Sequence, residues 1–277
     1  MLALPLQPHP FAMHPLISRL SVPLVAAPMF RVSCPELVIA AARAGIVGAF
    51  PTLNARTAHD LEDWLTRIAR ETAEAPGVPA ANLILHASNP RRDADLQAVV
   101  RHRVPVVIAS VGAPDDVIGP VHAYGGTVFA DVATVRHARR AAAAGADGLV
   151  LLTAGAGGNT GWLNPFAFIA EVRRFFDGMI AIAGGLTEGR QLHALRVAGA
   201  DLGYAGTPFI ATDESLAAPE YKAGVVTAGA DDILTTDAVT GIPANFVRTR
   251  LRELGLVDER DRAAAQGRLE VGGRGGG

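Results

Sequence analysis

Short apolar segments recur at regular intervals between residues 23 and 206 of the chain. Each is rich in small, β-branched or aliphatic side chains, which is the pattern of a buried strand. The eight segments cover residues 23–28, 46–50, 80–85, 104–110, 127–132, 148–153, 179–184 and 201–206. Between them, apolar positions three and four residues apart predict helices, for example over 58–73, 94–103, 134–144, 165–176 and 190–198. The alternation predicts an α/β protein with a parallel sheet and helical crossovers.

The strands are apolar on both faces, as expected where helices cover one face and a packed interior lies behind the other. Eight such units within about 200 residues favour a closed (β/α)8 TIM barrel, and an open doubly wound sheet is the alternative. The tripeptide Gly-Ala-Asp occurs at 145–147 and again at 199–201, each time after an alanine-rich segment. Because glycine commonly ends a helix, the two copies indicate a repeated unit of helix and strand.

The parts of the chain outside the repeated units suggest four regions. We expect an N-terminal extension over residues 1–22, the barrel over 23–211, and a short cap with a return to the barrel over 212–259. The last region, 260–277, is charged and ends in GGRGGG. It has little apolar surface to bury, so we expect it to be a disordered tail.

Composition narrows the classes of function. Hydrophobic residues make up 49% of the chain and the formal net charge is -2, which provides no basic field for nucleic acid. Cys34 is the single cysteine, so an internal disulfide and a cysteine-based metal site are excluded and a cytoplasmic location is expected. No apolar run is long enough for a membrane span. We expect small molecules as partners, no membrane and no metal, and leave a homodimer open.

Glycines gather where the last three strand segments end. The segment GAGGNTG (155–161) follows the sixth, Gly184-Gly185 ends the seventh, and Gly206-Thr207 ends the eighth. In a barrel these ends share one face, where backbone N–H groups and a hydroxyl such as that of Thr207 can bind phosphate. Glycines that serve tight turns are the alternative explanation for each pair taken alone.

Six segments together resemble a known family. They are AAPM, ANL, ATVRHARRAAAAGADGL, GAGGNTG, IAIAGGL and YAGTPFIAT, in this order between about Pro23 and Arg250. The ordered set resembles the nitronate monooxygenases, formerly called 2-nitropropane dioxygenases, which are FMN-containing TIM barrels. The resemblance implies FMN as cofactor, with NAD(P)H as a candidate electron donor.

The resemblance also assigns roles to residues. It implies that Ala27 and Met29 lie beside the flavin ring and that Asn82 hydrogen-bonds the polar edge of the ring. It implies that the glycine pairs bind the phosphate, because a flavin needs an anchor as well as donors near its ring. The residues assigned to the cofactor are Ala27, Met29, Asn82, Asp131, Gly157, Gly158, Gly184, Gly185, Gly206 and Thr207.

Two positions depart from the family pattern and are the candidate catalytic residues. Asn159 stands where the family usually has a histidine base, and an amide can orient a substrate but cannot take its proton. Asp131 stands where many members carry a lysine. A carboxylate there should weaken the binding of an anionic nitronate, because like charges repel. Asp131 is either a general base or an acceptor of hydrogen bonds.

These observations indicate an FMN-dependent oxidoreductase that resembles nitronate monooxygenase and oxidises or reduces a small organic substrate. An NAD(P)H-dependent quinone or enoyl reductase on the same fold is the first alternative. A non-redox TIM-barrel isomerase or lyase whose substrate carries phosphate is an alternative of another class. A flavin-binding protein that has lost catalysis together with the histidine is a third.

Overall fold

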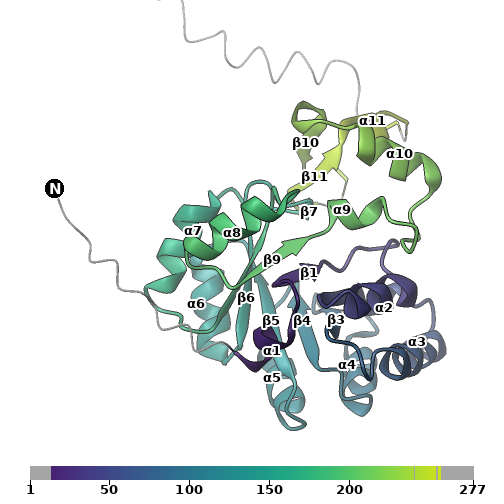
Figure 1. Ribbon diagram of the computed structural model, residues 1–277, viewed down its shortest axis with the longest axis vertical. Coiled ribbons are helices and arrows are strands. Elements are labelled where there is room, and N and C mark those ends of the chain that lie inside the picture. The colour runs from purple at the N-terminus through teal and green to yellow at the C-terminus, as the bar shows by residue number, and fades with distance from the viewer. Residues whose placement is uncertain (1–13, 240, 254, 257–277) are drawn as a thin grey trace, which may run out of the picture.

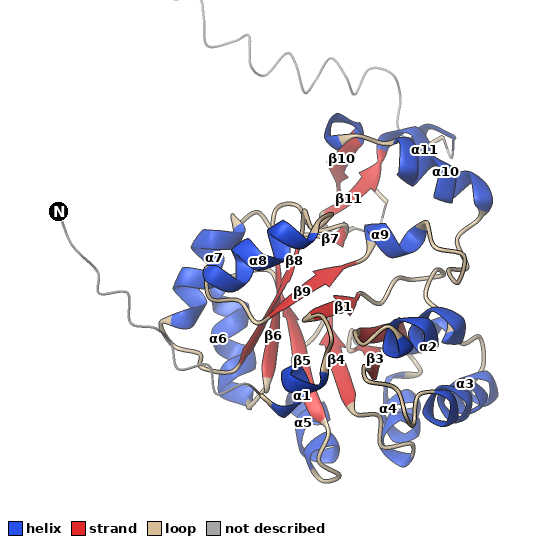
Figure 2. Cartoon of the chain, viewed as in Figure 1, coloured by secondary structure: helices blue, strands red, loops and turns tan. Residues whose placement is uncertain are grey.

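The computed structural model describes residues 14–239, 241–253 and 255–256. It shows a closed barrel of parallel strands surrounded by helices, with a small three-stranded sheet at one end (Figures 1 and 2). The barrel strands are β1 (Leu24–Ala26), β2 (Val47–Pro51), β3 (Val78–Ile84), β4 (Val106–Ser110), β5 (Thr127–Val132), β6 (Gly148–Leu152), β8 (Met179–Ala183) and β9 (Leu202–Ala205). Each lies within a segment predicted as a strand, or overlaps it by most of its length.

The pairing of the strands closes the sheet on itself. Val25 of β1 is in register with Val47 of β2 on one side and with Tyr204 of β9 on the other. All other neighbours in the barrel are also parallel and follow the order of the chain. The predicted (β/α)8 barrel is therefore confirmed, and the alternative of an open sheet is wrong.

Helices cover the outside of the barrel in Figure 2. They are α2 (Pro35–Arg43), α3 (Ala58–Glu71), α4 (Arg92–Arg101), α5 (Asp115–His122), α6 (Val135–Ala144), α7 (Pro165–Arg173) and α8 (Gly189–Val197). The five helices predicted from apolar spacing are all present. None of the described helices combines the length and the apolar character needed to cross a membrane.

Side chains alternate between the interior of the barrel and the layer of helices. On β4, Val106 and Ile108 belong to the interior cluster, whereas Val107 and Ala109 pack with the helices. The short helix α1 (Pro15–Arg19) adds Leu16 to the interior cluster and so closes the N-terminal end of the barrel.

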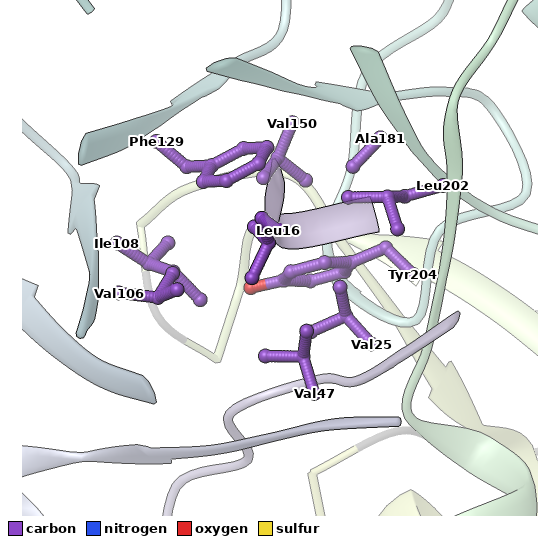
Figure 3. A pocket seen from close by; sticks show the side chains of 10 residues that line it. All are labelled: Leu16, Val25, Val47, Val106, Ile108, Phe129, Val150, Ala181, Leu202 and Tyr204. Carbon is purple, nitrogen blue, oxygen red and sulfur yellow. The ribbon is translucent and has the colours of Figure 1, made fainter. Parts of the chain in front are cut away.

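The interior leaves a cavity of about 10 Å³ (Figure 3). That volume holds one water molecule at most. The side chains that line it are Leu16, Val25, Val47, Val106, Ile108, Phe129, Val150, Ala181, Leu202 and Tyr204. A ligand of nucleotide size therefore has no room inside the barrel. It must bind at the mouth of the barrel, which is the end where the strands have their C-termini.

The two Gly-Ala-Asp tripeptides make the same structure twice. Oδ2 of Asp147 accepts a hydrogen bond from the backbone N–H of Val128 at 2.7 Å, and Oδ2 of Asp201 accepts one from Ile180 at 2.7 Å. Each aspartate thus binds the start of the preceding barrel strand. The second also forms an ion pair with Arg173 at 2.5 Å. The repeat predicted from the sequence is confirmed at the level of side-chain contacts.

A cap follows β9 and reaches the mouth of the barrel in Figure 1. It consists of α9 (Thr207–Ile210), α10 (Pro219–Thr227), η2 (Ala230–Asp232), β10 (Ile233–Thr236), β11 (Ala244–Val247) and α11 (Arg248–Glu253). β11 pairs with β10 and also with β7 (Gly158–Asn159), a short strand inside the glycine-rich loop after β6. The sequence did not predict this sheet. The predicted tail over 260–277 lies outside the described residues.

Candidate functional site

Three polar side chains form a chain of hydrogen bonds across β3, β4 and β5. Asn82, Ser110 and Asp131 occupy the positions that alternation directs to the interior, near the C-terminal ends of their strands. Nδ2 of Asn82 donates to Oγ of Ser110 at 2.6 Å and to the carbonyl oxygen of Ile108 at 3.0 Å. Ser110 Oγ donates to Oδ2 of Asp131. Asn82 and Asp131, both predicted site residues, are therefore linked by hydrogen bonds through Ser110.

The carboxyl group of Asp131 is poorly solvated. The residue as a whole is half-buried, but its Oδ1 atom is buried and has no hydrogen-bond partner in the described part of the chain. Burial raises the pKa of Asp131 to about 7, and the hydrogen bond from Ser110 opposes that shift. The group therefore changes its charge near neutral pH, where proton transfer to or from a substrate is most effective.

Tyr204 on β9 shares this environment. Its ring forms part of the wall of the interior cavity in Figure 3. Burial, and after it the charge of Asp131, raise the pKa of the Tyr204 phenol well above its usual value. The phenol therefore stays neutral and keeps a proton to donate.

The glycine loops after β6, β8 and β9 meet at the mouth. A Cβ atom placed on Gly155 would lie 3.3 Å from the backbone nitrogen of Gly185. One placed on Gly157 would lie 3.4 Å from Oγ1 of Thr207. The Gly185 N–H donates to the carbonyl oxygen of Gly155 at 3.2 Å. The loop after β6 therefore contacts both the loop after β8 and the start of α9.

Gly184 and Gly185 lack a side chain for different reasons. Both have a positive φ, 130° and 68°. A Cβ atom on Gly184 would lie 2.4 Å from Oγ1 of Thr153, so packing against the preceding loop accounts for this glycine. A Cβ atom on Gly185 would meet no heavy atom within 4 Å. Of the pair, Gly185 is the one whose bare backbone borders open space.

Met29 and Ala27, which follow β1, approach the same region. A Cβ atom on Gly206 would lie 3.3 Å from Sδ of Met29 and 3.8 Å from Cβ of Ala27. Next to them, Thr207 begins α9 with an exposed side chain. Pro208 has no N–H group and the N–H of Phe209 donates to the carbonyl oxygen of Gly206 at 2.9 Å, so the start of α9 offers the N–H and hydroxyl groups of Thr207. The mouth therefore combines an apolar surface with backbone donors.

Asn54 holds the loop that carries Met29. It ends the short helix η1 (Thr52–Asn54), which follows β2. Its Nδ2 donates to the carbonyl oxygens of Met29 at 2.9 Å and Ser33 at 2.7 Å, and its Oδ1 accepts from the N–H of Arg31 at 2.9 Å. Arg31 has a φ of 61°, which side chains other than glycine rarely adopt. One amide thus fixes a strained loop at the mouth.

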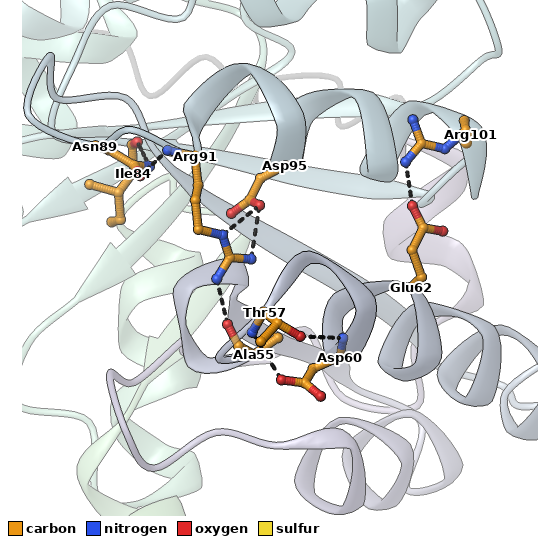
Figure 4. A network of polar contacts seen from close by, with 9 residues as sticks. All are labelled: Ala55, Thr57, Asp60, Glu62, Ile84, Asn89, Arg91, Asp95 and Arg101. Carbon is orange, nitrogen blue, oxygen red and sulfur yellow. Dashed lines mark hydrogen bonds and ion pairs between the residues drawn. The ribbon is translucent and has the colours of Figure 1, made fainter.

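A buried ion pair supports the neighbouring loops. The Arg91 guanidinium lies 2.9 Å and 3.1 Å from Oδ1 of Asp95 and also donates to the carbonyl oxygen of Ala55 at 2.6 Å (Figure 4). Asp95 is 1% exposed. Asn89 donates to the carbonyl oxygen of Ile84 at 2.8 Å and accepts from the Arg91 N–H at 3.0 Å. The pair links the loop after β2 to the loop after β3.

Asn159 lies in β7, where its backbone is in register with Ala244 of the cap. The residue is exposed, and its side chain makes no hydrogen bond within the described ranges. The adjacent loop is fixed from the cap as well, because Nδ2 of Asn245 donates to the carbonyl oxygen of Ala156 at 2.7 Å. Asn159 therefore has an anchored backbone and a free side chain at the mouth.

The residues predicted to bind the cofactor fall into two groups. Asn82 and Asp131 lie in the hydrogen-bonded chain, and the remaining cofactor candidates lie around the meeting point of the glycine loops. Sequence reasoning assigned no role to Ser110, Tyr204 or Asn54. For Ser110 and Tyr204 a signal existed, because each lies two residues beyond an apolar residue that faces the interior. Asn54 lies in a loop and had no such signal.

Known proteins show which family shares this arrangement. Residues 50–267 match the nitronate monooxygenase family. A relative from Rhodococcus jostii, (3aS,4S,5R,7aS)-5-hydroxy-7a-methyl-1-oxo-octahydro-1H-indene-4-carboxyl-CoA dehydrogenase, is 28% identical over 229 residues, covering 83% of this chain. The chain spans 44% to 64% of the length of this and two other curated relatives.

Two solved structures are similar throughout the fold. FabK from Thermotoga maritima has a TM-score of 0.77 and 27% identity, covering 90% of this chain and 79% of FabK. Nitroalkane oxidase from Streptomyces ansochromogenes has a TM-score of 0.78 and 28% identity, covering 87% of this chain and 81% of the oxidase. These similarities agree with the barrel and with the family match. The chain belongs to the nitronate monooxygenase family.

Proposed function

We propose that this chain is an FMN-dependent oxidoreductase that acts on a small organic substrate. The observation that carries the proposal is that the loop after β6 contacts Gly185 and Thr207, while Gly206 contacts Met29, at the mouth of the barrel. The closed barrel brings these strand ends together, but it does not require bare backbone beside open space, as at Gly185. A bound ligand gives a reason for that open space.

Features of the mouth fit a flavin nucleotide. The open space at Gly185 and the N–H and hydroxyl groups of Thr207 suit a phosphate group. Oδ1 of Asp131 is buried without a partner among the described residues, and Asn82 Oδ1 accepts no hydrogen bond from them, so both oxygens keep an unused capacity to accept a hydrogen bond. When bound, FMN supplies a ring that takes up and returns electrons.

The residues of the chain would then position the substrate and move a proton. Asp131 takes a proton from the substrate in its charged form and donates one in its neutral form. Asn159 orients a polar group of the substrate through its amide without taking a proton. Nitronate oxidation is the first reaction to test, because it gives the family its name.

A reductase that uses NAD(P)H and acts on a quinone or an enoyl substrate is the second candidate. Reduction of a carbon–carbon double bond needs a proton donor. Because the pKa of Asp131 is about 7, a fraction of its carboxyl groups is protonated at physiological pH and can donate. The similarity to a carboxyl-CoA dehydrogenase agrees with this alternative. A cytoplasmic homodimer stays a prediction.

The purified full-length chain tests the proposal directly. We expect a yellow protein that releases FMN on heating. In the absence of dissolved oxygen, NADH, NADPH or a substrate should bleach its colour, and an electron acceptor should restore it. The panel comprises a nitronate, a neutral nitroalkane, a quinone and an enoyl thioester. A colourless protein that FMN cannot reconstitute overturns the proposal and favours the non-redox barrel. Flavin without turnover of any compound favours a binding protein.

A further inference from the structure

The hydrogen bonds around Ser110 determine which oxygen of Asp131 exchanges a proton. We infer that Ser110 is a positioning residue that keeps Oδ2 of Asp131 as an acceptor, so that Oδ1 takes up and releases the proton. The consequence for turnover rests on the proposed function. The assignment of the proton itself rests on the geometry of three side chains and one carbonyl group.

The backbone carbonyl of Ile108 sets the direction of the chain of hydrogen bonds. A carbonyl oxygen only accepts, and it lies 3.0 Å from one terminal atom of the Asn82 side chain. That atom must be the amide nitrogen, because the amide oxygen would leave two acceptors facing each other. The same nitrogen lies 2.6 Å from Ser110 Oγ and donates its second hydrogen there. Ser110 Oγ is therefore an acceptor toward Asn82.

A hydroxyl group has one proton, and that of Ser110 has one acceptor among the described residues, which is Oδ2 of Asp131. If Asp131 placed its own proton on Oδ2, two protons would face each other or the Ser110 proton would lose its acceptor. Ser110 is 5% exposed, so loss of that hydrogen bond in a buried place is costly. Oδ2 therefore accepts whether Asp131 is charged or neutral.

Oδ1 is the remaining position for the proton, and it is the buried atom without a partner in the described structure. Its surroundings contain few charges. β3 and β4 present the uncharged Asn82 and Ser110, β9 presents the neutral phenol of Tyr204, and β6 presents the apolar Val150 in register with Asp131. Burial consequently dominates the titration of Asp131, and Ser110 is the side chain that opposes it.

One atom thus changes its role with pH. Below the pKa of Asp131, Oδ1 carries a proton and donates; above it, Oδ1 is an acceptor and a base. Loss of the Ser110 hydroxyl removes a hydrogen bond to the charged form, so the pKa of Asp131 must rise. The size of a hydrogen bond to a charged group predicts a rise of about one to two pH units.

NMR titration of protein labelled with ¹³C at the aspartate carboxyl carbons measures this rise. The flavin-free full-length chain is used, and Asp131→Asn identifies the signal. We expect Ser110→Ala to move the midpoint of Asp131 upward by about one to two pH units and Ser110→Thr to restore it. Ser215→Ala is the matched control, because Ser215 is buried and donates to Ile210 at 2.6 Å in the cap. An unchanged midpoint in Ser110→Ala overturns the inference.

If Ser110→Ala does not fold, Ser110→Cys replaces it, because cysteine is a weaker hydrogen-bond donor of similar size. This variant must give a smaller rise in the midpoint of Asp131.

Infrared spectroscopy tests which oxygen carries the proton. The stretch of the protonated Asp131 is isolated as the difference from Asp131→Asn at a pH below the titration. If Oδ2 is the carbonyl oxygen and accepts from Ser110, its C=O frequency must increase in Ser110→Ala. An unchanged frequency means that the carbonyl oxygen is Oδ1, which overturns the inference. Both measurements omit flavin, so a protein that proves not to bind FMN still gives a clear result.

Discussion

Nδ2 of Asn54 lies 2.9 Å from the carbonyl oxygen of Met29, so a residue after β2 supports the loop after β1. Asn54→Ala removes this bond and those to Arg31 and Ser33. We expect the free energy of unfolding to fall by about 1–3 kcal/mol and FMN binding to weaken about tenfold, because the loop loses its fixed position.

Urea unfolding and flavin titration measure the two effects of Asn54→Ala. Thr72→Ala is the matched control, since Thr72 is buried and donates to Ile68 at 2.8 Å at the opposite end of the barrel. It should lower stability without changing the affinity for FMN. Equal affinities for both variants would show that Asn54 acts on stability alone.

Gly185→Ala tests the open space at the glycine loops. The new Cβ atom meets no heavy atom but projects into the region proposed for the phosphate, and the positive φ costs about 1–2 kcal/mol. We expect a folded protein that retains much less FMN after gel filtration. Gly125→Ala is the control, because Gly125 has a φ of 82° and equally open surroundings between α5 and β5. Flavin retained equally by both variants would argue against phosphate binding at Gly185.

The raised pKa of Asp131 predicts how stability depends on pH. An unfolded aspartate titrates near 3.9 and the folded one near 7, so the folded state binds more protons between these values. The contribution of Asp131 is therefore present at low pH and is lost as the pH rises through about 7, by up to about 4 kcal/mol. Asp131→Asn should gain stability relative to wild type as the pH rises from about 4 to about 7, as judged by urea unfolding.

The control for that series is Asp116→Asn, a substitution at a side chain that is 78% exposed. A constant difference between wild type and Asp131→Asn across the same pH range would mean that Asp131 titrates like an exposed carboxyl group. It would then have no proton to exchange near neutral pH.

Arg91→Met tests the buried ion pair in Figure 4. It leaves the Asp95 carboxylate buried and unpaired, which should lower the free energy of unfolding by about 3–5 kcal/mol. The double variant Arg91→Met/Asp95→Leu should recover most of this loss. Arg101→Met breaks the exposed pair with Glu62 and should cost about 0–1 kcal/mol. Similar losses for both single variants in chemical unfolding would contradict the difference in burial.

Asn159→His introduces the residue type that the resemblance to the family implies at this position. Because the Asn159 side chain is free and its backbone is anchored to Ala244, the substitution should leave the fold and the flavin content unchanged. We expect faster oxidation of neutral nitroalkanes, since an imidazole can take a proton near neutral pH. No increase in rate at full flavin content would mean that the side chain points away from the substrate.

The barrel could be predicted because each of its strands has its own apolar segment. The segment 127–132, for example, is bounded by glycines before it and by the polar start of α6 after it. The sheet of β7, β10 and β11 could not be predicted in this way. Gly158 and Asn159 form too short a strand for any periodicity, and their partner Ala244 lies in a distant segment.

The part of the site that lies at strand ends could also be predicted from the sequence. Glycines at strand ends are visible in the sequence, and the barrel brings such ends together. The difference in surroundings between Gly184 and Gly185 depends on the position of Thr153, which only the packed structure gives. Ser110 connects Asn82 with Asp131 across three strands, and no spacing along the chain encodes that connection.

The pairing of β7 with β11 also bears on how the protein is made. The loop around Asn159 gains its backbone partners from Ala244 and Asn245, which leave the ribosome long after the last barrel strand. All the barrel strands are therefore synthesised before the partner strand of the loop around Asn159. A nascent or truncated chain that stops short of β11 would therefore have the barrel strands without the partner that fixes the backbone of the loop around Asn159.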